Sequence, residues 1–178
     1  RSFMSTALVR AAVLKNYREV ALGVGLNPVE MLHGVGLGAG VLGDPERLMP
    51  LTSALQLLEN SAERSGCPSF GLRMAETRQI ADFGAVSLLL NHQRNLRDAL
   101  LTTNEYRHLL NQTLAVDIEI SGKTTVIREE VMTEAGIPKR QATELAIGVL
   151  YRMCGSLLGR QWNPHSVSFS HSMIADRQ

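Results

Sequence analysis

Apolar residues at helical spacing define the first elements that the sequence predicts. A stripe of them at every third or fourth position, with charged residues off the stripe, predicts a helix over residues 5–22. Shorter helices are expected at residues 28–33, after an Asn-Pro start signal, and at residues 51–65, after Pro50. The segment 34–43 between them contains five glycines, which predicts a flexible loop. The stripe of the first helix consists of Val9, Val13, Tyr17, Val20 and Val24.

Helical patterns continue into the second half of the chain. They are expected at residues 70–76, 85–90 and 96–110, where apolar residues again recur with the helical period. Asn95 and Asp98 are three residues apart, the spacing of a capping box, with Asp in place of the usual Glu. The last of these helices is therefore expected to begin directly after Asn95.

The period then changes to two, which is typical of half-buried strands. Residues 114–121 and 124–132 flank a Gly-Lys turn and predict a β-hairpin. Pro138 opens a long helix to residue 158, and the alternating residues 166–171 predict a last strand that pairs with the hairpin. Four acidic side chains are assigned to the solvent side of the hairpin: Asp117, Glu119, Glu129 and Glu130.

These elements together predict an α+β fold, a mostly helical layer packed on a small antiparallel sheet near the C-terminus. No repeat or low-complexity linker divides the chain, so residues 4–175 are expected to form a single domain. A hydrophobic content of 44% and a charged content of 20% are ordinary for a folded domain. The formal net charge of +1 predicts no basic face, so this segment is not expected to hold DNA by itself.

The sequence contains no clear signal for a membrane, for secretion or for a bound cofactor. No apolar stretch is long enough to span a membrane and no secretion signal begins the chain, so we expect a cytoplasmic protein. Cys67 and Cys154 lie far apart without ligand spacing and are expected to be free thiols. A GxGxxG match at residues 38–43 lacks a preceding strand, and Asp44-Pro45 follows where a phosphate-binding helix would continue. We therefore expect no cofactor.

Catalytic and metal-binding patterns do not emerge from the sequence. The five histidines include no pair at a spacing that would present two imidazoles to one metal ion. No GxSxG nucleophile motif is present, and the acidic residues of the hairpin fit a solvated sheet face. The sequence therefore predicts neither a metal site nor an enzyme.

Five short motifs in a fixed order resemble the N-terminal domain of AraC/XylS-type bacterial transcription regulators. The resemblance is to the subfamily with an arabinose-binding-like domain, not a cupin, and it covers residues 10–175. Members of that family continue into a C-terminal helix-turn-helix domain, which this chain is expected to lack. The motifs occupy residues 42–50, 70–75, 82–84, 99–107 and, closest to the family pattern WxPxxVxFxH, 162–171.

The resemblance implies a regulatory domain that senses a small-molecule effector and forms a homodimer, with DNA bound only through the absent domain. We expect an effector pocket between the helical layer and the sheet. The candidate ligand-binding residues are polar or aromatic side chains near the covering helices: Arg73, His92, Tyr106, Arg107 and Trp162.

The candidate dimer interface lies on the long helix near the C-terminus, because its apolar residues occupy more than one face. In a competing arrangement the first helix covers this face and the chain stays monomeric. A module that only dimerises or docks a partner remains an alternative to ligand sensing, and an enzyme is a distant third. The candidate interface residues are Ile147, Leu150, Tyr151, Cys154 and Leu158.

Overall fold

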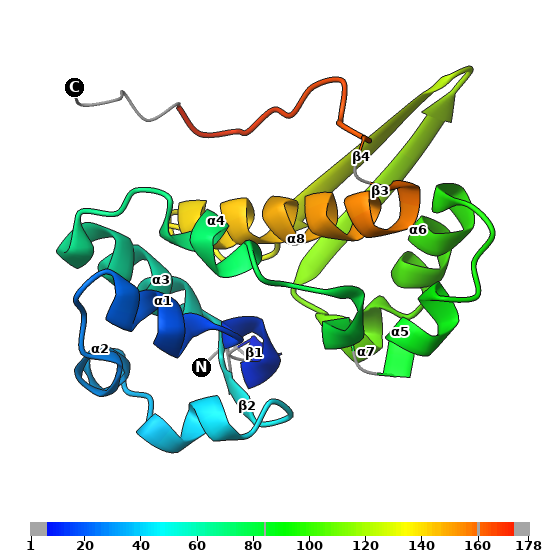
Figure 1. Ribbon diagram of the computed structural model, residues 1–178. Helices are drawn as coiled ribbons and strands as arrows, with labels where there is room; N and C mark the ends of the chain where they lie inside the picture. Colours follow the sequence, from blue (N-terminus) through cyan, green and yellow to red (C-terminus); the bar gives the residue numbers. More distant parts are fainter. Residues whose placement is uncertain (1–6, 84, 160, 173–178) are drawn as a thin grey trace, which may run out of the picture.

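The computed structural model describes residues 7–83, 85–159 and 161–172, apart from the side chain of Leu110. It is an α+β fold in which helices predominate, as the sequence predicted (Figure 1). The N-terminal half contains these elements in order: β1 (Leu8–Arg10), the 3-10 helix η1 (Ala11–Leu14), α1 (Tyr17–Gly23), α2 (Pro28–Gly34), the 3-10 helix η2 (Ala39–Gly43), β2 (Leu48–Pro50) and α3 (Leu51–Ser65). The second half contains α4 (Phe70–Ala75), the 3-10 helix η3 (Ile80–Phe83), α5 (Ala85–Leu90), α6 (Leu96–Glu105), α7 (Arg107–Leu110), β3 (Leu114–Ser121), β4 (Thr124–Val131) and α8 (Arg140–Leu158).

The predicted helix over residues 5–22 is confirmed only for its last part, since residues 17–22 belong to α1, and it is wrong for residues 8–14. Val9 lies in β1, which pairs antiparallel with β2, and the chain reaches α1 only after a 3-10 turn. The N–H of Ala11 donates to the Arg47 carbonyl oxygen at 2.8 Å, which directs the chain into the small sheet. Asn16, at a φ of 67°, adopts the left-handed conformation and separates the turn from the helix.

The glycine-rich segment after α2 is more ordered than the predicted flexible loop. Its first residue still belongs to α2, and residues 39–43 form η2. Val41 in η2 is buried in the core, which explains why the segment adopts one fixed path despite its glycines.

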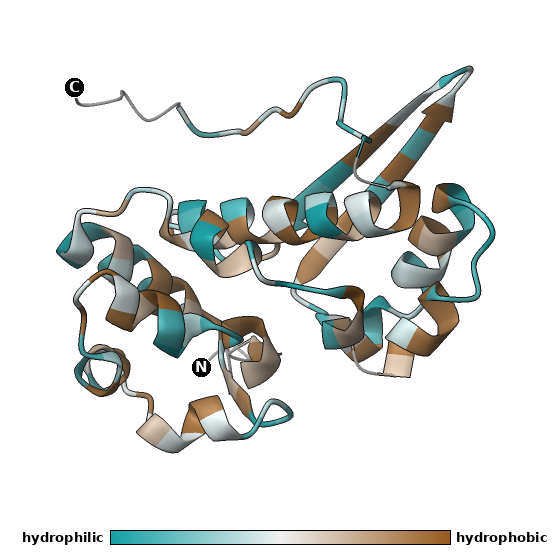
Figure 2. Ribbon diagram, in the orientation of Figure 1, coloured by the Kyte–Doolittle hydropathy of each residue, from teal (hydrophilic) through white to brown (hydrophobic). Residues whose placement is uncertain are grey.

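The predicted hairpin and the predicted cap of α6 are both confirmed. β3 pairs antiparallel with β4, with Ile118 opposite Ile127, and Figure 2 shows hydrophobic and hydrophilic positions alternating along both strands. The Asn95 side chain accepts a hydrogen bond from the Asp98 N–H at 2.9 Å and caps α6 as predicted.

The predicted strand at residues 166–171 is wrong, because these residues are not paired with the hairpin or with any other described strand. They belong to a segment that runs back along α8 after that helix ends (Figure 1). Side-chain contacts to α8 replace the strand pairing that the alternating sequence suggested. Alternation alone specifies an extended segment, but not its hydrogen-bonding partner.

Helix α8 connects two apolar clusters. It packs against α3, α4, α6 and β4, so one helix contacts both halves of the chain. Gly71 on α4 allows the closest approach, since a Cβ there would lie 2.1 Å from the Gln141 carbonyl oxygen. The first apolar cluster joins the N-terminal helices to α4 and includes Tyr17, Leu32, Leu57, Phe70 and Met74. The second apolar cluster joins α5, α6, the hairpin and α8, and its buried members are Val86, Leu90, Ala99, Leu100 and Met153.

Candidate functional site

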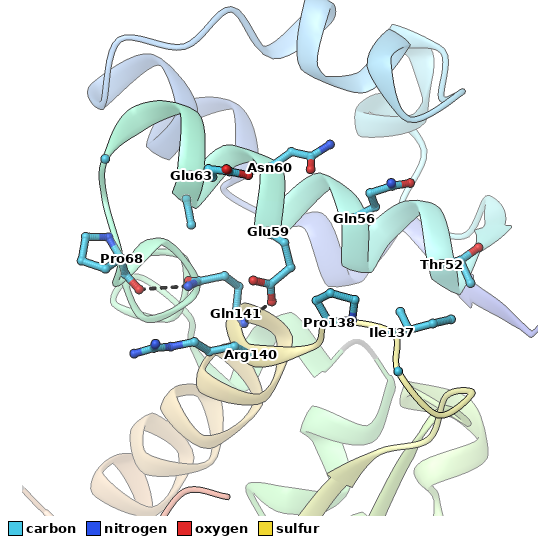
Figure 3. Close-up of a pocket in the computed structure, with 13 residues that line it drawn as sticks. Thr52, Gln56, Glu59, Asn60, Glu63, Pro68, Ile137, Pro138, Arg140 and Gln141 are labelled. Carbon is cyan, nitrogen blue, oxygen red and sulfur yellow. Dashed lines mark hydrogen bonds between the residues drawn. The ribbon is translucent and has the colours of Figure 1, made fainter. Parts of the chain in front are cut away.

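A groove of about 1030 Å³ lies between α3 and the start of α8 (Figure 3). One wall is the solvent-facing side of α3, where polar residues recur at helical spacing. The other wall is the turn that leads into α8. The groove is lined by Thr52, Gln56, Glu59, Asn60, Ala62, Glu63, Gly66, Pro68, Gly136, Ile137, Pro138, Arg140 and Gln141.

The floor of the groove is fixed by hydrogen bonds that also set the start of α8. No side chain at the N-cap position satisfies the first N–H groups of this helix. The Glu59 carboxylate on α3 performs that role from outside, accepting a hydrogen bond from the Gln141 N–H at 2.8 Å. The Gln141 side chain, nearly fully buried, donates to the Pro68 carbonyl at 2.9 Å and accepts from the Gly71 N–H at 2.8 Å. These contacts lock α3, α4 and α8 together around the groove.

The remaining polar groups of the groove are free to meet a ligand. Gln56 and Asn60 can both donate and accept hydrogen bonds, and Glu63 adds a carboxylate. Arg140 is the nearby cation, and it is paired with Glu144 at 3.0 Å. The lining therefore offers several hydrogen-bonding groups to a small molecule.

A second, smaller hollow of about 440 Å³ lies where α7 meets the base of the hairpin. Its walls combine the cationic Arg107 with apolar side chains of the first strand and of the residue after the second. The hollow is lined by Arg107, His108, Gln112, Leu114, Ala115 and Met132.

The five candidate ligand-binding residues do not gather in one place. Arg73 on α4 and His92 after α5 are exposed, and Tyr106 is half-buried against the second apolar cluster. Arg107 lines the smaller hollow, and Trp162 lies against Tyr151 with ring centroids 5.8 Å apart.

None of those five lines the groove, whose residues the sequence analysis did not single out. The polar positions 52, 56, 59, 60 and 63 repeat with the helical period, but that pattern is also what any solvent-facing helix surface shows. Only the contact between α3 and the start of α8 converts this surface into a groove.

The candidate interface residues on α8 divide into buried and accessible ones. Cys154 is 1% exposed, and Leu150 packs against the second apolar cluster. Ile147 is half-buried, whereas Tyr151 is 45% and Leu158 43% exposed. Helix α1, which a monomeric arrangement would place over this face, packs against α2 and α4 instead.

One acidic residue departs from its predicted surroundings. Asp117, Glu119 and Glu130 are exposed as expected, but Glu129 faces α8. Burial raises the pKa of the Glu129 carboxyl to about 8, and its Oε2 atom is buried without a hydrogen-bond partner. The sequence contained a signal for this, because Glu129 lies two residues from Ile127 on one side and Val131 on the other and so shares their face.

The two cysteines are buried and unpaired. Burial raises the pKa of the Cys154 thiol to about 11, with a further contribution from the nearby Glu129. At neutral pH this thiol is therefore protonated and unreactive.

The described residues contain neither a metal-binding cluster nor a helix that could span a membrane. No group of three or more His, Cys, Asp or Glu residues there is arranged to hold a metal ion. None of the helices in the same ranges is long and apolar enough to cross a membrane.

Comparison with known proteins places these features in a family. Residues 25–178 match the sequence profile described as the arabinose-binding domain of AraC transcription regulator, N-terminal. The chain is 26% identical over 170 residues to the HTH-type transcriptional regulator VirS of Mycobacterium tuberculosis, in strains CDC 1551 / Oshkosh and ATCC 25618 / H37Rv. The match covers 94% of this chain and 50% of each relative, so the chain spans about half the length of the curated relatives it matches.

Proposed function

Because this chain belongs to the family of N-terminal arabinose-binding domains of AraC transcription regulators, we propose that it senses an effector and dimerises within such a regulator. Transcription would be controlled through a helix-turn-helix domain elsewhere in the protein, in the cytoplasm, where the DNA lies. The relatives named as HTH-type regulators are about twice as long as the matched segment, which leaves room for that domain. This segment alone, with a net charge of +1, would contribute little to DNA affinity.

The groove between α3 and α8 is the observation that carries the sensing proposal. Ligand sites are typically hollows of about 300–1,000 Å³ with a few convergent polar groups. At about 1030 Å³ the groove lies at the upper limit of this range, and it presents Gln56, Asn60 and Glu63 around a fixed floor. A small polar effector that bound here would bridge α3 and the start of α8.

Such a bridge would act on regulation only if the effector binds two arrangements of the protein with unequal affinity. Helix α8 connects both apolar clusters and carries the candidate dimer residues, so a shift at its start can change the geometry of a dimer. The spacing of two DNA-binding domains would change with it, which is the coupling that an allosteric regulator requires.

Thermal shift measurements with a panel of polar small molecules test the sensing proposal. The panel should include arabinose and other polyols, amino acids and amines. A specific ligand raises the melting temperature progressively with its concentration, because it binds the folded state alone. Asn60→Ala should abolish the shift, whereas the matched Gln112→Ala in the smaller hollow should leave it intact.

The opposite result, a shift lost in Gln112→Ala and kept in Asn60→Ala, would move the effector to the smaller hollow. A panel without any binder would leave a dimerisation or docking module, the alternative function. The full regulator, footprinted on its own upstream region with and without the ligand, then decides whether binding reaches the DNA.

Dimerisation is supported by the two large side chains that α8 leaves accessible, Tyr151 and Leu158. Sedimentation at micromolar concentration should give a dimer, and Leu158→Asp should dissociate it. Leu150 is unsuitable for this test, because a charge there would disrupt the second apolar cluster. A single species of 19.5 kDa in the unmutated chain would refute the dimer.

A further inference from the structure

Two carboxylates of the groove between α3 and α8 have no cationic partner. Glu59 and Glu63 lie one helical turn apart on α3, and both line the groove. Within the described part of the chain, no lysine, arginine or histidine lies at ion-pair distance from either of them. Like charges four residues apart on a helix repel each other, so this pair does not stabilise α3 by itself.

The cations that flank the groove in the sequence are paired with acids outside it. Arg64 follows Glu63 directly on α3, and Lys139 and Arg140 stand at the start of α8. Each pairs with a carboxylate that does not line the groove, which leaves the groove with an excess of negative charge. The three pairs are Arg64 with Glu30 at 3.0 Å, Lys139 with Glu130 at 3.3 Å and Arg140 with Glu144 at 3.0 Å.

The role of Glu59 at the start of α8 occupies only part of its carboxylate. Its Oε1 atom accepts the hydrogen bond from the Gln141 N–H at 2.8 Å. A carboxylate has two oxygens with about four lone-pair positions, so further positions remain for a donor. Figure 3 shows the Glu59 side chain pointing from α3 toward the start of α8, which places its charge between the two walls of the groove.

The rest of the lining combines apolar surface with amide groups. Ile137 and Pro138 form the wall opposite α3, in the turn that leads into α8 (Figure 3). Gln56 and Asn60 stand on the α3 wall and can each accept a hydrogen bond. A ligand that matches this lining has a positively charged head, N–H donors and a short aliphatic body.

An organic cation fits these groups better than a metal ion does. The described residues contain no group of three or more His, Cys, Asp or Glu arranged to hold a metal ion. An ammonium or guanidinium group, in contrast, binds carboxylates through charge-assisted hydrogen bonds, and the planar guanidinium can contact two oxygens at once.

We propose that the effector of the groove is an organic cation, an amine or guanidine with a short aliphatic body, whose charged head lies between Glu59 and Glu63. This inference rests on the sensing function proposed above and adds to it the chemical class of the ligand.

Three probes of nearly the same size measure the preference for charge. The compound n-butylguanidinium is cationic, n-butylurea is its neutral counterpart, and pentanoate carries an anionic group on a similar chain. Each is titrated at constant ionic strength into the isotope-labelled chain and followed by amide NMR. The amide signals of Gly66 and Gly136, which line the groove, report binding there, and Gly122 in the hairpin turn is the reference.

We expect n-butylguanidinium to bind about fivefold more tightly than n-butylurea, because attraction to exposed carboxylates is modest in water. Pentanoate should not bind. Added salt should reduce the difference between the first two probes, since it screens exposed charges.

Variants of the two carboxylates test whether they cause the preference. In Glu59→Gln the side-chain oxygen can still accept from the Gln141 N–H, so the charge is removed and the start of α8 is kept. Combined with Glu63→Gln, this substitution should reduce the preference for n-butylguanidinium to within about twofold. Glu105→Gln removes an exposed carboxylate on α6 and should leave the preference unchanged.

Equal affinities for n-butylguanidinium and n-butylurea, or tighter binding of pentanoate, would overturn the cationic class and leave the sensing function intact, since a ligand would still occupy the groove. A preference that survives in the double variant would overturn the role of the two carboxylates. Absence of n-butylguanidinium binding would also overturn the inference, whereas the sensing function is judged by the wider panel of polar molecules.

Discussion

Replacement of Glu129 by Gln tests whether a carboxyl that is neutral at physiological pH lies between the hairpin and α8. The folded protein raises the pKa of this group from 4.5 to about 8, because burial penalises the carboxylate and no hydrogen bond compensates for it. Because the pKa of Glu129 is higher in the folded chain than in the unfolded chain, this group does not lower the free energy of unfolding at a pH below the unfolded pKa. Stability is then lost as the pH rises from about 4.5 towards about 8.

The size of the effect follows from these two pKa values. At about pH 5 the unfolded chain gains little from ionising Glu129, whereas at about pH 7 it gains about 3 kcal/mol that the folded chain cannot match. Gln has nearly the same shape and does not ionise. The free energy of unfolding of Glu129→Gln, minus that of the unmutated chain, should therefore increase by about 2.5 kcal/mol between about pH 5 and about pH 7.

Urea denaturation at both pH values, followed by circular dichroism, measures this difference. Only its change with pH is used, so a constant cost of burying the Gln amide cancels. Glu130→Gln is the matched control, because Glu130 lies on the opposite face of the same strand and forms only a surface ion pair with Lys139 at 3.3 Å. A difference for Glu129→Gln that stays flat within about 0.5 kcal/mol, like that of the control, would refute the burial argument.

Substitutions at Gly71 and Asn95, each with a control variant, test the helix packing and the helix cap. Gly71→Ala should lower the free energy of unfolding by about 3 kcal/mol or prevent folding, because the new methyl group would lie 2.1 Å from a main-chain carbonyl oxygen of α8. Gly155→Ala, which meets no atom within 4 Å, should raise it by about 0.5–1 kcal/mol, and equal effects of the two in thermal melts would contradict this account. Asn95→Ala should cost about 1 kcal/mol in urea denaturation through loss of the α6 cap, whereas Asn95→Asp should cost much less.

The proposed groove and residues 161–172 both contact α8, although they meet different parts of its surface. The groove meets the start of the helix through Gln141, and His171 lies 3.4 Å from Glu144 in the next turn. Arg140 lines the groove and also pairs with Glu144, so a ligand that draws Arg140 away would weaken the neutralisation of that buried carboxyl. Arg140 therefore connects the groove to the buried Glu144 carboxyl.

The sequence by itself determined those elements whose signals are local. Helices α3 and α8, the hairpin and the Asn95 cap all follow from apolar periodicity, from proline and glycine positions or from a side chain that bonds a main-chain N–H three residues away. The fold class followed from the order of these elements. The family followed from short motifs that the profile match over residues 25–178 confirmed.

The tertiary structure alone decided the features whose partners are distant in the sequence. β1 has three residues and forms only because β2, about forty positions later, offers its main-chain groups, so helical spacing of its apolar residues could not exclude it. Residues 166–171 alternate like a strand, but the side chains of this C-terminal segment meet Tyr151 and Glu144 on a helix. The groove exists because Glu59 on α3 meets the start of α8. Periodicity specifies which face of an element is apolar, and only packing specifies what that face, or the polar face behind it, will meet.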